Sequence, residues 1–227
     1  KAFISGGGHS DLYLTMVRTG EDGPKGVSAV LVEDGTAGLS FGANERKMGW
    51  RAQPTSQVQF DDCKIPADHL LGEEGAGFRY AMAGLDGGRL NIAASALGAA
   101  QSALEKALQY AQERKAFGKH LADFQAMQFK LADMETRLQA ARALLYKAAW
   151  KLDHKTPDAG KFCAMAKQFV TDAAFETAND ALQIHGGYGY LADYGMEKIV
   201  RDLRVHQILE GTNEIMRMIV SRALLAA

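Results

Sequence analysis

The chain has 227 residues, of which 47% are hydrophobic and 23% charged, and its formal net charge at pH 7 is −1. This is an ordinary globular composition, and its balanced charge argues against nucleic acid or an anionic membrane as a partner. Cys63 and Cys163 have neither metal-ligand spacing nor the number needed for a disulfide framework, which fits a reducing compartment. No apolar run is long enough to span a bilayer.

The first 75 residues predict β-structure. Strands are expected at residues 2–4, 12–17, 27–32 and 56–60, with turn signals between them. The triglycine at residues 6–8 is predicted as a turn, because neither an amphipathic helix nor a βαβ unit frames it as a dinucleotide site. Residues 1–5 have the character of the middle of a strand and no initiator methionine precedes them, so we expect the chain to be part of a longer protein.

From residue 76 the apolar period becomes helical. A first helix is expected to end near residues 115–118, and a second to run from residue 127 to 154. A third, opened by Pro157, is expected to stop at residues 185–187, followed by a short helix around 196–200 and a last one after Gly211. The predicted core stripes are Leu90, Ala94, Leu97, Gln101, Leu104, Leu108 and Ala111; Met127, Leu131, Met134, Leu138, Ala141 and Leu145; and Phe162, Ala166, Phe169, Ala173 and Leu182.

These patterns predict an α+β fragment. Residues 1–75 are expected to form the C-terminal part of a middle β domain, a partial antiparallel β-barrel or sheet. Residues 76–227 are expected to form an antiparallel C-terminal four-helix bundle. The change of composition near residue 75 is the predicted domain boundary.

Glu210 is the residue best suited to chemistry. It lies between the apolar pair Ile208-Leu209 and Gly211, just before a helical pattern. Apolar neighbours can desolvate a carboxylate and make it a stronger general base. Gly211 permits close approach of a ligand or backbone, and Thr212 is predicted to cap the helix. The alternative is that Glu210 only complements the helix dipole, and the residues alone favour that alternative.

Three other segments have both a structural and a functional explanation. Residues 85–89, LDGGR, place two glycines in a helical pattern. Each glycine lowers helix stability by about 1 kcal/mol relative to alanine. Either a helix kink or close crossing, or a ligand packed against the backbone, would explain them. Asp86 and Arg89 are spaced to pair. Residues 113–118, ERKAFG, suit a helix C-terminus or a phosphate. Residues 183–190, QIHGGYGY, can stop a helix or approach an anion.

No set of residues predicts a metal site. The six histidines are scattered without an HExxH pair, and no GxSxG nucleophile motif is present.

Taken in order, LDGGR, ERKAFG, QIHGGYGY, VRDLRVHQ and ILEGTNEIMR resemble the acyl-CoA dehydrogenase family. The likeness covers essentially the whole chain and is closest to the short- and branched-chain members. Five motifs in this order across two fold types make the resemblance specific. It implies that the chain corresponds to the C-terminal two-thirds of such an enzyme, without the N-terminal helices and the first β segment.

The resemblance implies FAD-dependent α,β-dehydrogenation of a short or branched acyl-CoA to the 2-enoyl-CoA. Glu210 matches the family's catalytic base, which takes the α-proton while the β-hydrogen leaves as hydride to flavin N5. The enolate oxygen would accept hydrogen bonds from the main-chain N–H of Glu210 and a ribityl hydroxyl of FAD. Nitroalkane oxidase relatives use Asp as the base, which argues against that activity.

Other positions match binding contacts of the family. The acyl-CoA contacts correspond to Asp86, Gly87, Gly88, Arg89 and Arg222. The FAD contacts correspond to Phe3, Ile4, Ser5, Arg114, Phe124, Gln125, Gln183, Ile184, His185, Gly186, Gly187, Thr212, Asn213 and Glu214. Phe3 departs from the Trp of many relatives. Tyr80, Leu85 and Leu209 are candidates to face the acyl group.

The FAD contacts from Arg114, Phe124, Gln125 and residues 183–187 cross between subunits in the family. They imply a homo-oligomer, there a tetramer built as a dimer of dimers. The expected electron acceptor is an electron-transferring flavoprotein, and neither nucleic acid nor a membrane is an expected partner. A bacterial cytoplasm, or a mitochondrial matrix in a eukaryote, would suit this chemistry.

Two other functions stay open at this point. An acyl-CoA oxidase would share the base and flavin but let oxygen reach the reduced flavin, so substrate-dependent peroxide formation in air would favour it. A non-catalytic fragment that serves assembly would form an oligomer that never takes up flavin.

Overall fold

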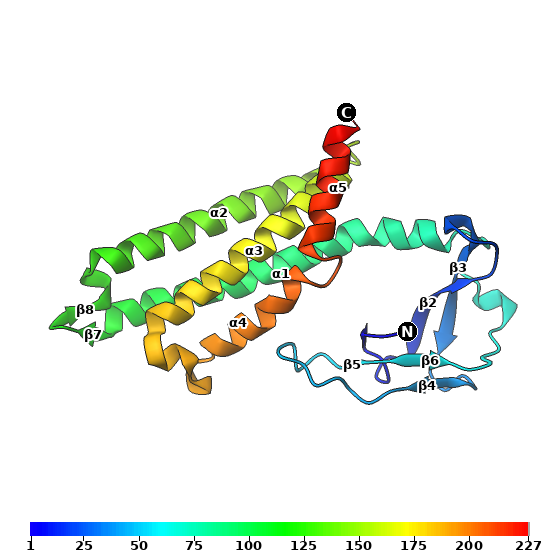
Figure 1. Cartoon of the computed structure of the whole chain (residues 1–227), viewed down its shortest axis with the longest axis horizontal. Coiled ribbons are helices and arrows are strands. Elements are labelled where there is room, and N and C mark those ends of the chain that lie inside the picture. The colour runs from blue at the N-terminus through cyan, green and yellow to red at the C-terminus, as the bar shows by residue number, and fades with distance from the viewer. Residues whose placement is uncertain (227) are drawn as a thin grey trace. The chain divides into compact units, whose positions relative to one another are not determined.

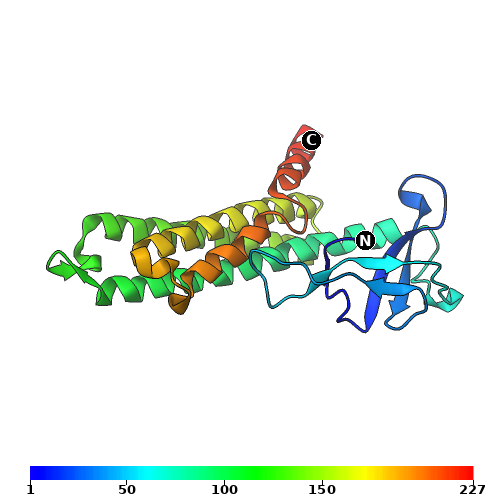
Figure 2. The same cartoon turned by 60° about the horizontal axis from the view of Figure 1, so that its bottom comes forward.

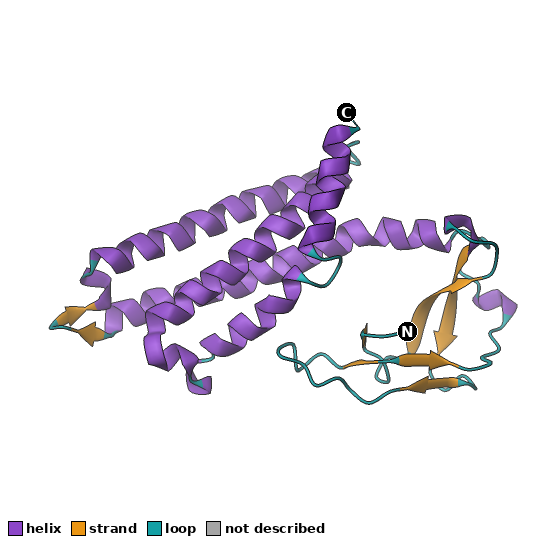
Figure 3. Ribbon diagram, viewed as in Figure 1, coloured by secondary structure: helices purple, strands orange, loops and turns teal. Residues whose placement is uncertain are grey.

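The computed structural model describes residues 1–226, which divide into two compact units at residues 85 and 86. Strands of the first unit form three small antiparallel sheets, β1 with β5, β2 with β3 and β4 with β6 (Figure 3). Their bounds are β1 (Ile4–Ser5), β2 (Leu12–Arg18), β3 (Val27–Glu33), β4 (Leu39–Phe41), β5 (Thr55–Ser56) and β6 (Val58–Phe60). No closed barrel is found among these residues.

The core of this unit comes from the alternation of side chains along its strands. Tyr13 on β2 pairs directly with Val32 on β3, and both are buried with Val58 of β6. The ring of Phe41 lies 5.4 Å from that of Tyr13, measured between centroids. A mainly apolar face shared by three strands therefore holds the unit together.

The single strand expected at residues 56–60 is wrong, because the chain changes sheets there. Ser56 pairs with Ile4 in one sheet, whereas Val58 pairs with Phe41 in another. Between them the carbonyl of Gln57 accepts a hydrogen bond from Gly42 at 2.9 Å. The first strand also starts at residue 4 rather than 2, and strand β4 was not predicted.

The second part of the chain is helical. Its helices are α1 (Gly77–Glu113), α2 (Gln125–Asp153), α3 (Ala159–His185), α4 (Met196–Arg204) and α5 (Asn213–Leu225). From residue 86 onward, α1, α2 and α3 share one apolar core (Figures 1 and 2). The fold class predicted from the sequence, a small antiparallel β part followed by a helical bundle, is confirmed.

The helix α1 buries a face slightly different from the predicted stripe. Leu90, Leu97, Leu104 and Ala111 are buried as expected. Ala94, Gln101 and Leu108 are not in the core, and Ala93, Ala100 and Ala107 are buried in their place. Both patterns share every seventh residue, so periodicity alone did not separate them. Small alanines face the core because they let neighbouring helices approach closely.

Two helix ends differ from the expectation. The helix α1 stops at Glu113, because the following residues form a hairpin of β7 (Lys115–Ala116) and β8 (Lys119–His120). The helix α3 begins at Ala159, so Pro157 lies just outside it. The ends of α2 and of α3 at His185 agree with the prediction to within one or two residues.

We keep residues 75 and 76 as the proposed domain boundary. The helix α1 begins at Gly77, where a Cβ would lie 2.4 Å from the carbonyl carbon of Ser28. A glycine is therefore needed for this helix to start against β3.

None of the helices in residues 1–226 combines the length and apolar character needed to cross a membrane.

The bundle core gives a direct test of packing. Leu138 on α2 is fully buried in it, so Leu138→Ala should lower the free energy of unfolding by about 2–5 kcal/mol. Leu225→Ala, at an exposed position that ends α5, should change it by less than about 0.5 kcal/mol. Denaturant unfolding of both variants measures the difference, and equal losses would contradict this core assignment.

Candidate active site

Glu210 lies in the short connection before α5, and its main chain has an unusual conformation. Its φ is 56° and that of Gly211 is 84°, so two successive residues are left-handed. Thr212 then returns to an extended conformation and caps α5, its Oγ1 accepting a hydrogen bond from the N–H of Ile215 at 3.5 Å. The cap predicted at Thr212 is confirmed.

The Glu210 carboxylate lies directly against the main chain of α1 at Gly88. A Cβ placed on Gly88 would be 2.8 Å from Oε2 of Glu210 and 3.1 Å from its Cδ. Oε2 is buried and has no hydrogen-bond partner within residues 1–226. Such a carboxylate oxygen is a proton acceptor that the chain itself leaves unused.

Asp86 and Arg89, which lie on either side of Gly88 in α1, form the expected ion pair. Nη1 of Arg89 donates to Oδ1 of Asp86 at 2.6 Å, and the Arg89 side chain is only 12% exposed. The carboxylate of Asp86 also lies close to Gly160, in the first turn of α3, where the helix dipole favours an anion. Nε of Arg89 is buried without a partner in the described part of the chain.

Lys167, in the first half of α3, bonds to the connection that carries Glu210. This side chain is fully buried. Its Nζ donates to the carbonyl oxygen of Gly211 at 2.8 Å and to Oδ1 of Asn213 at 2.9 Å. Burial lowers the pKa of Lys167 to about 8, while the nearby carboxylates of Asp172, Glu210 and Glu214 oppose that shift.

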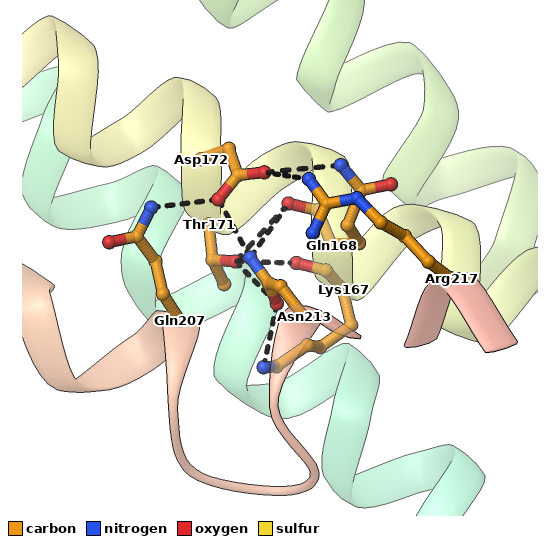
Figure 4. A network of polar contacts seen from close by, with 7 residues as sticks. All are labelled: Lys167, Gln168, Thr171, Asp172, Gln207, Asn213 and Arg217. Atoms are coloured by element: carbon orange, nitrogen blue, oxygen red, sulfur yellow. Dashed lines mark hydrogen bonds and ion pairs between the residues drawn. The ribbon is translucent and has the colours of Figure 1, made fainter. Parts of the chain in front are cut away.

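Asn213 extends this contact into a network on one face of α3 (Figure 4). Its Nδ2 donates to Oδ1 of Asp172 at 2.7 Å and to Oγ1 of Thr171 at 3.0 Å. Asp172 also accepts hydrogen bonds from Gln207 at 2.7 Å and Gln168 at 3.1 Å, and pairs with Arg217 at 3.2 Å. The side chain of Asn213 is therefore used by the protein, and any flavin contact it makes would come from its main chain.

Two buried groups near this network are electrically neutral at pH 7. Burial lowers the pKa of His206 to about 4, helped by the charge of Lys167. Burial raises the pKa of the Cys163 thiol to about 11, helped by the Asp86 carboxylate. Neither side chain has the thiolate or imidazolium character that would make it a nucleophile or an acid here.

A second candidate site lies at the other end of α3. A pocket of about 460 Å³ is lined by Tyr110, Arg114, Leu121, Ile184, His185, Gly186, Gly187, Tyr188 and Leu191. The rings of Tyr110 and His185 stack with centroids 4.3 Å apart, and the Arg114 guanidinium lies 5.4 Å from the Tyr188 ring centroid. Eighteen residues of helix separate Lys167 from His185, which is about 27 Å at 1.5 Å per residue.

The remaining predicted site residues fall in several places. Phe124 caps and Gln125 begins α2, with Nζ of Lys119 at 4.2 Å from the Phe124 ring centroid. Gln183 is exposed in the last turn of α3, and Arg222 in the last turn of α5. Phe3, Ile4 and Ser5 belong to the β unit, where Ile4 and Ser5 form β1 and Phe3 is 79% exposed with φ 57°.

Glu214 and its neighbour Thr212 interact at the start of α5. The pKa of Glu214 is lowered by its own main-chain N–H and by the hydroxyl of Thr212. Both residues thus support the helix start beside Glu210.

Lys167, Asp172 and Tyr110 are not among the site residues that the sequence predicts. A signal for Lys167 was present: it lies four residues after Cys163 and three before Val170, on the buried face of α3. A lysine at such a position is rarely there without a hydrogen-bonding partner. Asp172 and Tyr110 give no comparable signal, because aspartate and tyrosine are both common on half-exposed helix faces.

The contact between Glu210 and Gly88 can be tested by adding one methyl group. Gly98 lies in the same helix with open space where a Cβ would be, so Gly98→Ala should stabilise the chain by about 0.5–1 kcal/mol. Gly88→Ala should gain less, because the Glu210 carboxylate must move. Denaturant unfolding and a crystal structure of each variant would check this. A Gly88→Ala structure with Glu210 unmoved would contradict the contact.

The network around Asp172 predicts a dependence of stability on pH. Burial alone would raise the pKa of Asp172, but the hydrogen bonds from Gln207, Gln168 and Asn213, with Arg217, lower it below its ordinary 3.8. Its stabilisation should therefore be complete above about pH 4 and be lost as the pH falls through the lower folded-state pKa.

Asp172→Asn should lower the free energy of unfolding by about 2 kcal/mol at pH 7, and it should flatten the loss of stability that occurs as the pH falls below about 4. Unfolding curves at several pH values measure this, with Asp133→Asn on the exposed face of α2 as the control for one lost charge. An unchanged acid profile in Asp172→Asn would contradict the assignment.

Known proteins match the chain along its whole length. Residues 75–225 match the family model described as "Acyl-CoA dehydrogenase, C-terminal domain", and residues 1–63 match "Acyl-CoA dehydrogenase, middle domain". The chain is 55% identical to the mitochondrial isobutyryl-CoA dehydrogenase of Bos taurus, over 99% of this chain and 54% of that protein.

Two solved structures extend the comparison to the fold. Butyryl-CoA dehydrogenase from Megasphaera elsdenii matches with a TM-score of 0.95 and 45% identity, over 99% of this chain and 59% of that one. The FAD complex of PigA matches with a TM-score of 0.93 and 32% identity, over 98% and 58%. The chain thus spans somewhat more than half the length of these relatives. On the strength of both domain matches and these identities, the chain belongs to the acyl-CoA dehydrogenase family.

Proposed function

We propose that the chain carries the catalytic base of an FAD-dependent dehydrogenase that converts a short or branched acyl-CoA to its 2-enoyl-CoA, and that Glu210 is that base. The observation that carries this proposal is the position of the Glu210 carboxylate. Oε2 is buried against Gly88 without a hydrogen-bond partner among residues 1–226. A purely capping acid would instead bond the first N–H groups of α5, a role that Thr212 fills.

The proposed step is removal of the α-proton of the thioester by Oε2 of Glu210. The thioester carbonyl makes this proton acidic, and negative charge grows on the carbonyl oxygen as the proton leaves. The main-chain N–H of Glu210 makes no hydrogen bond to any described residue, so it is available to donate to that oxygen. Fixed donors of this kind stabilise an enolate without reorganisation.

The pocket at the end of α3 fits one part of an FAD molecule. Arg114 makes no ion pair in residues 1–226, and nothing fills the space where Cβ atoms of Gly186 and Gly187 would be. A guanidinium that makes no ion pair, beside an accessible glycine backbone, suits a pyrophosphate. When bound, FAD supplies a hydride acceptor that no amino-acid side chain provides.

This pocket is remote from Glu210 along α3. The FAD molecule that binds in the pocket can therefore differ from the FAD molecule that reacts with the substrate at Glu210. The resemblance assigns the contacts of Arg114, Phe124, Gln125 and residues 183–187 to the flavin of a neighbouring subunit. We therefore propose a homo-oligomer in which subunits share each flavin. Phe3, Ile4 and Ser5 in the β unit, and residues 212–214 in the helical unit, are each proposed as further flavin contacts on the basis of the resemblance. A tetramer and transfer of electrons to an electron-transferring flavoprotein belong to the same proposal.

The substrate class rests on the relatives and on α1. Two of them are named for isobutyryl-CoA and butyryl-CoA, which supports a short acyl chain for this protein. Asp86, Gly87, Gly88 and Arg89, together with Arg222, are the proposed CoA contacts, and the unpartnered Nε of Arg89 is a donor available for one of them. The bovine relative is mitochondrial by name, and a bacterial cytoplasm would suit the same chemistry.

The test is Glu210→Gln in the flavin-loaded protein. The variant should keep the absorption spectrum of bound flavin, because the glutamine side chain has nearly the same shape as glutamate. Without a carboxylate to take the α-proton, isobutyryl-CoA should reduce the flavin at least about 1,000-fold more slowly in the absence of oxygen. Stopped-flow absorbance measures the rate, and Glu105→Gln, an exposed position on α1, serves as the control. Reduction of Glu210→Gln at the normal rate would show that the base lies elsewhere.

A further inference from the structure

We propose that Lys167 is a positioning residue for the reaction, because it holds the main chain beside Glu210 in the conformation that keeps the carboxylate at Gly88. This inference rests on the proposed role of Glu210. Among the described residues, the ammonium of Lys167 bonds the main chain of Gly211 and the side chain of Asn213, so Lys167 acts through this connection and not as one of the proposed substrate contacts.

The connection needs an external restraint. Glu210 has a side chain and yet adopts φ 56°, a left-handed conformation that is costly for residues other than glycine. Gly211 continues the same turn at φ 84°, where a Cβ would lie 2.8 Å from Cε of Met216. A segment released from its contacts would leave this conformation, and the Glu210 side chain would move with it.

Lys167 supplies that restraint at the residue immediately after Glu210. Its Nζ donates to the Gly211 carbonyl at 2.8 Å and so fixes the direction of that peptide unit. The same Nζ donates to Oδ1 of Asn213 at 2.9 Å. One buried cation thereby holds the residues on both sides of Thr212, from a rigid position in the first half of α3.

A role in docking α5 alone explains the arrangement less well. Asn213 already binds Thr171 and Asp172 on α3, and Arg217 binds Asp172, so α5 is attached without Lys167. The two direct partners of the ammonium are neutral oxygens, and a buried cation without a direct carboxylate partner is costly. What Lys167 adds beyond docking is the bond to the main chain next to Glu210.

The experiment compares Lys167→Met with Lys130→Met in the flavin-loaded protein. Methionine keeps the length and apolar stem of lysine but has no donor. Lys130 pairs with Asp180 between α2 and α3, so its variant also loses one interhelical lysine contact. The readouts are the rate of flavin reduction at saturating isobutyryl-CoA, the Kd for that thioester, the melting temperature, and a crystal structure of each variant.

Lys167→Met should reduce its flavin about 100-fold more slowly, since a displacement of about 1 Å at a reacting group has that effect. The Kd should change less than about threefold, because CoA contacts are untouched, and the crystal structure should show Oε2 of Glu210 away from Gly88. Lys130→Met should keep the normal rate. Lys167→Gln, whose amide still donates, should recover part of the rate and also serves if the methionine variant does not fold.

A normal rate in Lys167→Met with Glu210 still at Gly88 would overturn the proposal, as would equal rate losses in the two methionine variants. The Glu210→Gln variant separates the proposed role of Glu210 as the base from the proposed positioning role of Lys167. If it is reduced normally, the proposed base is wrong; if it is inactive while Lys167→Met is normal, only the positioning role fails.

Discussion

The candidate site depends on one close contact, in which the Glu210 carboxylate packs directly against the main chain of α1 at Gly88. Glu210 can lie at Gly88 only because α1 has no side chain there and because the connection before α5 adopts two successive left-handed residues. Both conditions are unfavourable locally, the first through helix propensity and the second through backbone strain. They are maintained by buried polar contacts with α3, chiefly those of Lys167 and Asn213.

The helix α3 organises two candidate sites at once. Lys167, Thr171 and Asp172 on its first half hold the segment that carries the base (Figure 4). Its last turn and the glycines after it form a pocket with Arg114, the residue that follows α1. A rigid helix fixes the separation of the two sites, which is compatible with the proposed sharing of each flavin between subunits.

Several features of the site were predictable from residue types and spacing. The pair of Asp86 and Arg89 follows from i, i+3 geometry on a helix, and the cap at Thr212 follows from the preference of hydroxyl side chains for that position. The identity of the family followed from five motifs in order. In contrast, periodicity predicts a stripe on α1 that the structure buries only in part, and it predicts one strand at residues 56–60 where the chain changes sheets. A local pattern does not show which neighbour each residue meets.

Local pattern and motif order were enough to predict the family, the division into a β part and a helical part, and Glu210 as the candidate base. Three further facts appear only in the folded chain: Gly88 lies under that carboxylate, Oε2 of Glu210 has no partner in the described residues, and Lys167 bonds the residue next to it. These three facts join α1, α3 and the connection before α5, which are separated by tens of residues. Contacts between distant segments arise from packing, and no local propensity encodes them.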